Sequence, residues 1–270
     1  MATHLRPLSV LTIAGSDSGG GAGIQADLKT FAAHRVHGLS AIAALTAQHT
    51  RGVSEVHVPP VDFLHAQLDA CFDDFEIGAA KLGMLATADV IDAVADVLDA
   101  RSPPWIVLDP VMVSTSGARL LAEDALDALR RRLLPLASVA TPNLPEAELL
   151  LGRGIADIDD MRAACAALLA LGVRAVLLKG GHLATGDEVV DLYADADGLR
   201  EFAHPRLQVE GHGTGCTLAS AVAANLCRGA TLPQACVEAS DYVHRALRGG
   251  YRPGRGDVVV LDHFGAALPR

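Results

Sequence analysis

The chain has 270 residues, of which 50% are hydrophobic and 4% aromatic, and its formal net charge is −10. This acidic balance argues against nucleic acid or an anionic membrane as a partner, because either would repel the protein. The length and the abundance of Ala, Val, Leu and Gly predict a single α/β domain over residues 1–270, with helices covering a buried parallel sheet.

The cysteines do not indicate a disulfide framework or a structural zinc site, because they form no CxxC pair and their number is odd. They stand at positions 71, 165, 216, 227 and 236. Residues 1–7 lack the basic and apolar regions of a secretion signal, and no apolar run approaches the roughly 20 residues of a membrane helix. We therefore expect a soluble, cytoplasmic protein.

The first predicted unit is a strand over 8–14, a loop with five glycines over 15–23, and a helix from 24 to about 34. This order is typical of nucleotide-binding folds, but two common motifs are absent. A P-loop needs Lys and then Ser or Thr where this chain has Gly21 and Ala22, and a dinucleotide fingerprint needs glycine in place of Ile24. We interpret the loop as a close approach to a ligand rather than a flexible turn.

The next predicted elements are strands over 38–45 and 53–58, a helix over 62–74, a short strand leading into a loop over 77–84, a helix over 88–100 and a strand over 105–108. Alternating polar and apolar residues place 53–58 at an exposed edge of the sheet. Asp109 follows the last of these strands and precedes Pro110. Ligands of parallel sheets bind beyond the carboxyl ends of the strands, so Asp109 is a candidate site residue, although an aspartate that stabilises its own turn fits equally well.

Two further strand ends carry polar residues. We predict a helix over 122–134, a strand over 136–140, a helix that begins at Pro145, a helix over 158–171 and a strand over 173–178. Asn143 and Glu146 follow the first of these strands, although an acid in the first turn is also ordinary helix chemistry. Lys179 ends the second strand before two glycines, and it fits a cation that neutralises a polyphosphate better than one that only reaches solvent.

The C-terminal part contains a predicted hairpin of strands 188–193 and 199–204, a helix over 232–248 and an extended piece over 258–261. Between them, three alternating glycines run directly into an apolar helix over the segment 211–226. Such a loop gathers unpaired N–H groups at the positive end of a helix dipole. The segment therefore predicts an anion cradle, with Cys216 at its lip.

Two acids, a lysine and a backbone anion cradle are the parts needed for Mg-dependent phosphoryl transfer. The residues that carry these parts resemble the ribokinase-like superfamily and, within it, the hydroxymethylpyrimidine/phosphomethylpyrimidine kinases of thiamine biosynthesis. The matching segments are 14–27, 46–48, 81–84, 108–112, 141–147, 179–182 and 212–218. They occur in the order of the family, and together they are highly specific.

The resemblance implies a three-layer α/β/α sandwich with a mostly parallel central sheet. It implies that ATP and Mg²⁺ serve to phosphorylate 4-amino-5-hydroxymethyl-2-methylpyrimidine and then its monophosphate. Gln48 would bind the aminopyrimidine edge, and the pocket would be lined by Gly15, Ala22 and Met84. Related kinases are often dimers, so a homodimer is also implied.

The resemblance also implies the residues that handle phosphate and metal. Asp109 and Glu146 would position Mg²⁺, while Asn143 and Lys179 would contact the ATP phosphates, with Lys179 also serving catalysis. The N–H groups of an anion hole would come from the cradle, at Gly213, Gly215 and Cys216.

Cys216 stands where most of the superfamily has an aspartate base. A helix N-terminus lowers the pKa of a thiol from its usual value of about 8.5, so Cys216 could act as a base or orient the substrate hydroxyl. A loose transition state needs little base strength, which favours the orienting role, and a cysteine that only packs the helix start fits less well.

Two other functions compete with this interpretation. A pyridoxal or pyridoxine kinase shares the fold, but those enzymes usually carry aspartate at the position of Cys216. A non-catalytic nucleotide-binding protein has no need of a thiol on the substrate side. His49 departs from the asparagine that commonly follows Gln48 in the family, which affects the expected geometry of the pocket and not the class of reaction.

Overall fold

The computed structural model of the protein describes residues 7–114, 117, 120–122, 124–183 and 186–267. Residues 1–6, on which the expectation about a secretion signal depended, lie outside these ranges. Among the described helices, none combines the length and the apolar character that crossing a membrane requires.

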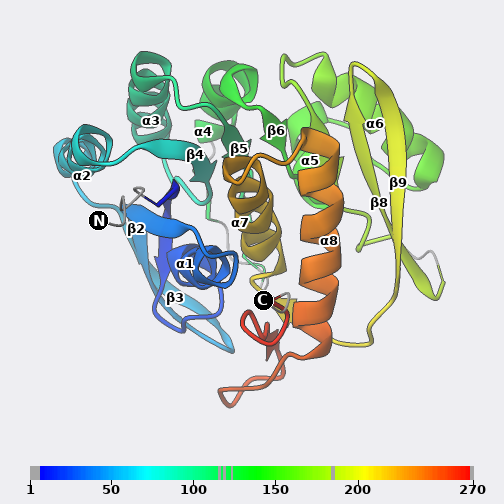
Figure 1. Ribbon diagram of the computed structural model, residues 1–270. Coiled ribbons are helices and arrows are strands. Elements are labelled where there is room, and N and C mark those ends of the chain that lie inside the picture. The colour runs from blue at the N-terminus through cyan, green and yellow to red at the C-terminus, as the bar shows by residue number, and fades with distance from the viewer. Residues whose placement is uncertain (1–6, 115–116, 118–119, 123, 184–185, 268–270) are drawn as a thin grey trace, which may run out of the picture.

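Within the described residues, a nine-stranded sheet forms the centre of the molecule (Figure 1), in the order β3-β2-β1-β4-β5-β6-β7-β8-β9. The strands from β2 to β7 along this order pair in parallel, whereas β3 pairs antiparallel at one edge and β8 and β9 at the other. The predicted edge position of 53–58 and the predicted hairpin are therefore confirmed. The strands are β1 (Ser9–Asp17), β2 (His37–His49), β3 (Gly52–His57), β4 (Ile77–Leu82), β5 (Ile106–Leu108), β6 (Val139–Ala140), β7 (Val176–Leu178), β8 (Glu188–Asp195) and β9 (Gly198–Pro205).

Helices cover both faces of this sheet, so the predicted three-layer α/β/α sandwich is confirmed. One face carries α2 (Val61–Asp74), α3 (Ala88–Arg101), α4 (Ala125–Ala128), α5 (Leu144–Leu151) and α6 (Ile158–Leu169). The other face, turned to the viewer in Figure 1, carries α1 (Gly23–Ala33), α7 (Thr214–Cys227) and α8 (Leu232–Arg248). A short parallel pair, β10 (Gly211–His212) and β11 (Val259–Val260), lies beside the start of α7.

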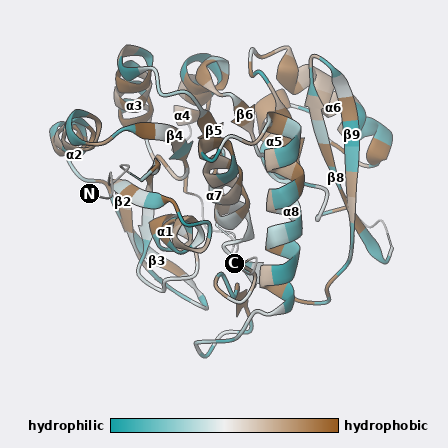
Figure 2. Ribbon diagram, in the orientation of Figure 1, coloured by the Kyte–Doolittle hydropathy of each residue, from teal (hydrophilic) through white to brown (hydrophobic). Residues whose placement is uncertain are grey.

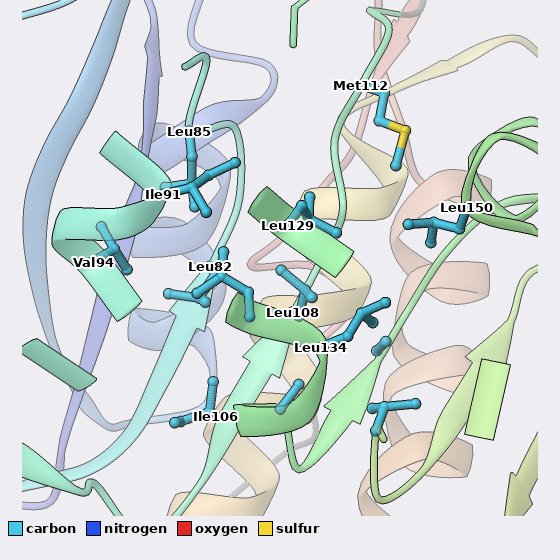
Figure 3. Close-up of a cluster of buried hydrophobic side chains, with 14 of the residues drawn as sticks. Leu82, Leu85, Ile91, Val94, Ile106, Leu108, Met112, Leu129, Leu134 and Leu150 are labelled. Carbon is cyan, nitrogen blue, oxygen red and sulfur yellow. The ribbon is translucent and has the colours of Figure 1, made fainter. Parts of the chain in front are cut away.

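Alternate strand residues supply the two cores, as expected for a sheet that is buried on both faces. On β1, Leu11 and Ile13 belong to one core and Val10 to the other. Figure 3 shows the first core, where Leu82 and Leu108 from adjacent strands lie close to helical leucines. Helix α7 is apolar almost all round, whereas α8 is two-sided (Figure 2), because α7 is packed between the sheet and its neighbouring helices.

Several predicted boundaries are wrong. Strand β1 continues three residues into the predicted glycine loop, because pairing with β2 extends to Asp17 opposite Thr46. The helix predicted over 122–134, of which residue 123 lies outside the described residues, instead begins at Ala125, and a π-helical turn (129–133) and a 3-10 turn (134–136) follow α4. Pro135 has no N–H to continue a helix, and these turns shorten the following strand. Strand β7 likewise begins later than predicted, at Val176.

Candidate active site

A cavity of about 700 Å³ opens beyond the carboxyl ends of the parallel strands. This is where ligands bind in open α/β sheets, and the volume is typical of a small-molecule site. All of the site residues predicted from the sequence line this one cavity: Gly15, Ala22, Gln48, Met84, Asp109, Asn143, Glu146, Lys179, Gly213, Gly215 and Cys216.

The predicted anion cradle is the first turn of α7. This helix already begins at Thr214, so Gly215 lies inside its first turn and not in a loop before the helix. Gly213 caps the helix with a φ of +85°, and the N–H of Thr217 donates to its carbonyl oxygen at 2.9 Å. The N–H groups of Thr214, Gly215 and Cys216 therefore precede the first hydrogen bond within the helix and can bind an anion.

The cradle touches the glycine-rich loop that follows β1. A Cβ atom at Gly213 would overlap the carbonyl oxygen of Gly21 and lie 2.9 Å from its carbonyl carbon. Two constraints therefore require glycine at position 213: the positive φ of the backbone, and the space that the carbonyl group of Gly21 occupies. The loop over 15–23, which we interpreted as a close approach to a ligand, therefore also lies directly against the anion cradle.

Asp17 holds the glycine-rich loop in place. Its carboxylate accepts hydrogen bonds from the N–H groups of Gly19 (2.8 Å), Gly21 (3.0 Å) and Ala22 (2.8 Å), and Nε2 of His212 lies 3.0 Å from Oδ2. Burial alone would raise the pKa of Asp17, but the hydrogen bonds from His212 and the loop outweigh it and lower the pKa. Asp17 and His212 lie inside the segments 14–27 and 212–218, but neither was predicted from the sequence as a site residue.

A second group of lining residues, Gly15, Ala22, Gln48 and Met84, lies beside the cradle, with Cα of Ala22 3.2 Å from the point where a Cβ of Gly213 would be. Sδ of Met84 lies 3.0 Å from the point where a Cβ of Gly15 would be, so a side chain at position 15 would displace Met84. The amide of Gln48 accepts a hydrogen bond from Oγ1 of Thr46 at 3.0 Å, and its Nε2 lies 3.2 Å from Nε2 of His212. Because Nε2 of His212 donates to Asp17, it cannot also accept from Gln48, and the hydrogen bond from Thr46 is the one that orients the amide.

The strand ends of β5, β6 and β7 bring the predicted polar residues together. Nζ of Lys179 lies 3.3 Å from Oδ1 of Asp109 and 3.9 Å from Oε2 of Glu146. Asn143 and Glu146 also form the capping box of α5, in which each side chain accepts the other's N–H, at 2.9 Å and 2.8 Å. The ordinary capping role of Glu146 thus coexists with its place in the site.

Burial and charge together set the ionisation of this cluster. Burial raises the pKa of Glu146 to about 7, opposed by Lys179 and reinforced by Asp109. Burial alone would lower the pKa of Lys179, but Asp109 and Glu146 outweigh it and raise the pKa. Lys179 therefore remains a cation at the floor of the cavity.

Asp109 and Glu146 fit a divalent cation that is shared with a ligand. Oδ2 of Asp109 is buried and has no hydrogen-bond partner among the described residues, so a cation would satisfy an otherwise unpaired carboxylate oxygen. The described residues contain no cluster of three or more His, Cys, Asp or Glu that could hold a metal by themselves. Mg²⁺ suits such a site, because it usually takes one or two carboxylates and completes its shell with water and phosphate.

Cys216 lies in the first turn of α7 and is half-buried. Burial raises the pKa of its thiol to about 12, opposed by Lys81 and reinforced by Asp109. The net direction is opposite to the lowering expected from the helix N-terminus, because the cost of burying a thiolate is the larger effect.

The cavity is also lined by residues that were not predicted from the sequence. Asp191 on β8 accepts hydrogen bonds from the N–H of Gly180 (2.9 Å) and from Oγ of Ser240 (3.1 Å). His204 on β9 and His244 on α8 stack with their ring centroids 5.0 Å apart, and both line the cavity. The sequence predicted the hairpin and the helix but offered no signal that they meet beside Lys179.

The chain is similar to known proteins over nearly its whole length. The family model of phosphomethylpyrimidine kinase matches residues 17–261. A hydroxymethylpyrimidine/phosphomethylpyrimidine kinase of Streptomyces coelicolor is 49% identical over 258 residues, which cover 95% of this chain and 94% of that protein. A thiamine biosynthesis bifunctional protein of Geobacter sulfurreducens is also 49% identical over 260 residues, but this chain spans only 53% of its length.

The fold also has a match among solved structures. An ADP complex of Bacillus subtilis pyridoxal kinase superposes with a TM-score of 0.90 at 35% sequence identity, over 97% of this chain and 100% of that one. Sequence and structure thus point to two groups of kinases, the phosphomethylpyrimidine kinases and the pyridoxal kinases.

Proposed function

The chain belongs to the phosphomethylpyrimidine kinase family, and we propose that it uses ATP to phosphorylate 4-amino-5-hydroxymethyl-2-methylpyrimidine and then its monophosphate, in thiamine biosynthesis. One observation carries this proposal: the first turn of α7, with Cys216, shares a single cavity with Gln48 and Met84 and with the cluster of Lys179, Asp109 and Glu146.

We assign the two ends of the cavity to the two substrates. The pyrimidine binds against Gly15, Ala22 and Met84, with its aminopyrimidine edge on Gln48, which is already held at the pocket edge by Thr46. ATP binds at the opposite end, with its phosphates near Lys179 and Asn143. This arrangement aims the γ-phosphate at the first turn of α7.

The cradle then acts on the group that is transferred. In the first reaction the hydroxymethyl oxygen forms a bond to the γ-phosphorus while the bond from that phosphorus to ADP breaks, and the hydroxyl proton passes late in the step to an oxygen of the transferred phosphoryl group. The N–H groups of Gly213, Gly215 and Cys216 stabilise the charge on the moving phosphoryl group. Cys216 orients the hydroxyl by a hydrogen bond, a role favoured over that of a strong base because burial keeps its pKa high.

The second reaction needs less from Cys216. A phosphomonoester is already largely ionised at neutral pH, so its oxygen attacks without losing a proton to the protein. The same cradle and the same lysine serve both transfers.

Asp109 and Glu146 would hold Mg²⁺, which neutralises charge on the ATP phosphates when bound. The unpaired Oδ2 of Asp109 supports this assignment. Lys179 contacts both carboxylates and limits their mutual repulsion in the absence of a cation.

A second candidate function is pyridoxal kinase, favoured by the structural match to the Bacillus subtilis enzyme. A side-by-side assay with Mg-ATP and each ring compound separates the two. We expect conversion of the hydroxymethylpyrimidine to its monophosphate and then its diphosphate, and turnover with pyridoxal alone would contradict the proposal.

Three further expectations belong with this function. We propose that residues 1–270 act as one domain, that the protein is a homodimer, and that it works in the cytoplasm. Light scattering on the purified protein measures the oligomeric state directly.

A further inference from the structure

A backbone turn over residues 180–183 follows Lys179 on the wall of the cavity. The N–H of Leu183 donates to the carbonyl oxygen of Gly180 at 3.0 Å and closes the turn. The two residues in between line the cavity. Because the proposed function places the ATP phosphates near Lys179, this turn borders the place assigned to the nucleotide.

The guanidinium of Arg206, directly after β9, binds the backbone on both sides of this turn. Its Nη1 donates to the carbonyl oxygen of Gly181 at 3.0 Å, and its Nη2 donates to that of Leu183 at 2.7 Å. Its Nε donates to the carbonyl oxygen of Gly186 at 3.1 Å, and Nη2 also donates to that of Glu188 at 3.2 Å. Arg206 therefore ties the turn to the start of β8.

The carboxylate of Asp191 holds the same turn through an N–H group. Its Oδ1 accepts a hydrogen bond from the N–H of Gly180 at 2.9 Å, and its Oδ2 accepts one from Oγ of Ser240 at 3.1 Å. A Cβ atom at Gly180 would overlap the carbonyl oxygen of Val190, so the turn is packed directly against β8. Asp191 thus fixes the start of the turn, and Arg206 fixes the peptide groups that follow.

The turn keeps two backbone N–H groups available beside the lysine. Among the residues that the structure describes, the N–H groups of Gly181 and His182 have no hydrogen-bond acceptor. The carbonyl of Gly181 points at Arg206, so the planar peptide directs the N–H of His182 the opposite way. Successive backbone N–H groups bind phosphate oxygens, and a nearby ammonium strengthens that binding. Arg206 therefore sets the direction of a phosphate donor next to Lys179.

An arginine suits this task better than a lysine. The guanidinium is planar and presents five N–H donors in a fixed fork, so one side chain serves four carbonyl oxygens from defined directions. A lysine ammonium has three donors on a flexible stem, so a lysine at position 206 would leave at least one of these oxygens without its partner. The exchange of Arg206 for lysine therefore keeps the charge and loosens the turn.

We propose that Arg206 is a positioning residue for the nucleotide: it holds the 180–183 turn so that Lys179 and the N–H of His182 meet the phosphates of ATP together. This inference rests on the proposed function, which assigns the phosphates to Lys179. Arg206 acts through the backbone that it binds and takes no part in the pocket for the pyrimidine. Its loss weakens the binding of nucleotide and leaves the binding of pyrimidine unchanged.

Two variants test this role, Arg206→Lys and Arg206→Gln, with Arg162→Lys and Arg162→Gln as matched controls. Arg162, on α6, pairs with Glu201 on β9 at 2.6 Å, so it braces the same hairpin from outside the cavity. Calorimetry measures the affinities for Mg²⁺ with AMP-PCP, a non-hydrolysable ATP analogue, and for the hydroxymethylpyrimidine. Hydrogen exchange at the hydrogen-bonded amides of Gly180 and Leu183 reports the order of the turn. Thermal unfolding shows whether each variant is folded.

We expect the Kd of Mg-AMP-PCP to rise about 10-fold in both Arg206 variants and that of the pyrimidine to change less than about 2-fold. Exchange at the two amides should be at least about 10-fold faster in these variants and unchanged in the controls.

The proposal would be overturned by folded Arg206 variants with wild-type affinity for the nucleotide or wild-type exchange, by equal losses for both ligands, or by the same losses in the controls. Failure of both Arg206 variants to fold would also overturn it, because the residue would then be structural. A wild-type protein that binds the nucleotide but does not phosphorylate the pyrimidine, with the difference between the variants intact, would count against the proposed function alone.

Discussion

Replacing Gly213 with alanine is expected to damage the site far more than it damages the fold. The residue has a φ of +85°, a conformation that costs an L-residue roughly 1–2 kcal/mol. In addition, the new Cβ would overlap the carbonyl oxygen of Gly21, so the glycine-rich loop and the start of α7 must move apart. Because this moves the N–H groups of the cradle, we expect kcat to fall by about 10²- to 10³-fold in both transfers.

A matched control lies at the other end of the same helix. Gly229, just beyond the end of α7, has a φ of +94°, but a Cβ there would meet no atom within 4 Å. Gly229→Ala should therefore show the conformational cost alone, a loss of about 1–2 kcal/mol in unfolding free energy. Its kcat should remain close to that of the wild type.

The assay is steady-state kinetics of both transfers, with urea unfolding of each variant at the same pH. Both variants should lose a similar amount of unfolding free energy because of the positive φ, and Gly213→Ala should lose more because of the overlap with Gly21. Only Gly213→Ala should lose kcat. Equal activity in the two variants would refute the argument that the contact between Gly213 and Gly21 positions the cradle.

Three other substitutions test separate parts of the site. Asp109→Asn should lower kcat about 100-fold and weaken the activation by Mg²⁺, measured as rate against metal concentration; an unchanged metal dependence would argue against Asp109 as a ligand. Gln48→Ala should weaken pyrimidine binding about 10-fold, from the loss of one or two hydrogen bonds, and leave ATP binding intact; calorimetry that finds a matching loss for ATP would reject the pocket assignment. Asp17→Asn should lower the unfolding free energy at pH 7 by about 2 kcal/mol. Because the pKa of Asp17 is lowered on folding, its contribution is present above the ordinary value of 3.8 and is lost as the pH falls below it, so urea unfolding should show the difference from the wild type shrinking in acid; a constant difference would contradict this role.

The residues at strand ends could be predicted because one rule places them together. In a parallel sheet the carboxyl ends of neighbouring strands meet at one edge, so Asp109, Asn143 and Lys179 had to converge once their strands were recognised. The bridge between Asn143 and Lys179 is the direct result. The anion cradle could also be predicted, because its signal in the sequence is local: glycines that stand directly before an apolar helix.

Contacts between distant loops could not be predicted in this way. Asp17 and His212 are 195 residues apart, and no spacing in the chain indicates that their side chains meet. The same holds for Lys81 and Asp27, since a lysine inside an apolar strand gives no sign of the carboxylate that neutralises it. The pKa of Cys216 was misjudged for a related reason: the helix N-terminus is visible in the sequence, but the burial that outweighs it is not.

The central claim is that one site carries out both transfers and that Cys216 serves the one that starts from a hydroxyl group. The most direct test is a single-turnover measurement of both phosphorylations by the wild type and by Cys216→Ala, with the products followed by phosphorus NMR. The account predicts that the variant forms the monophosphate at least about 100-fold more slowly, yet converts added monophosphate to diphosphate within about 3-fold of the wild-type rate. Equal loss in both steps would contradict it, because the cysteine would then be part of the shared cradle or of the packing beneath it.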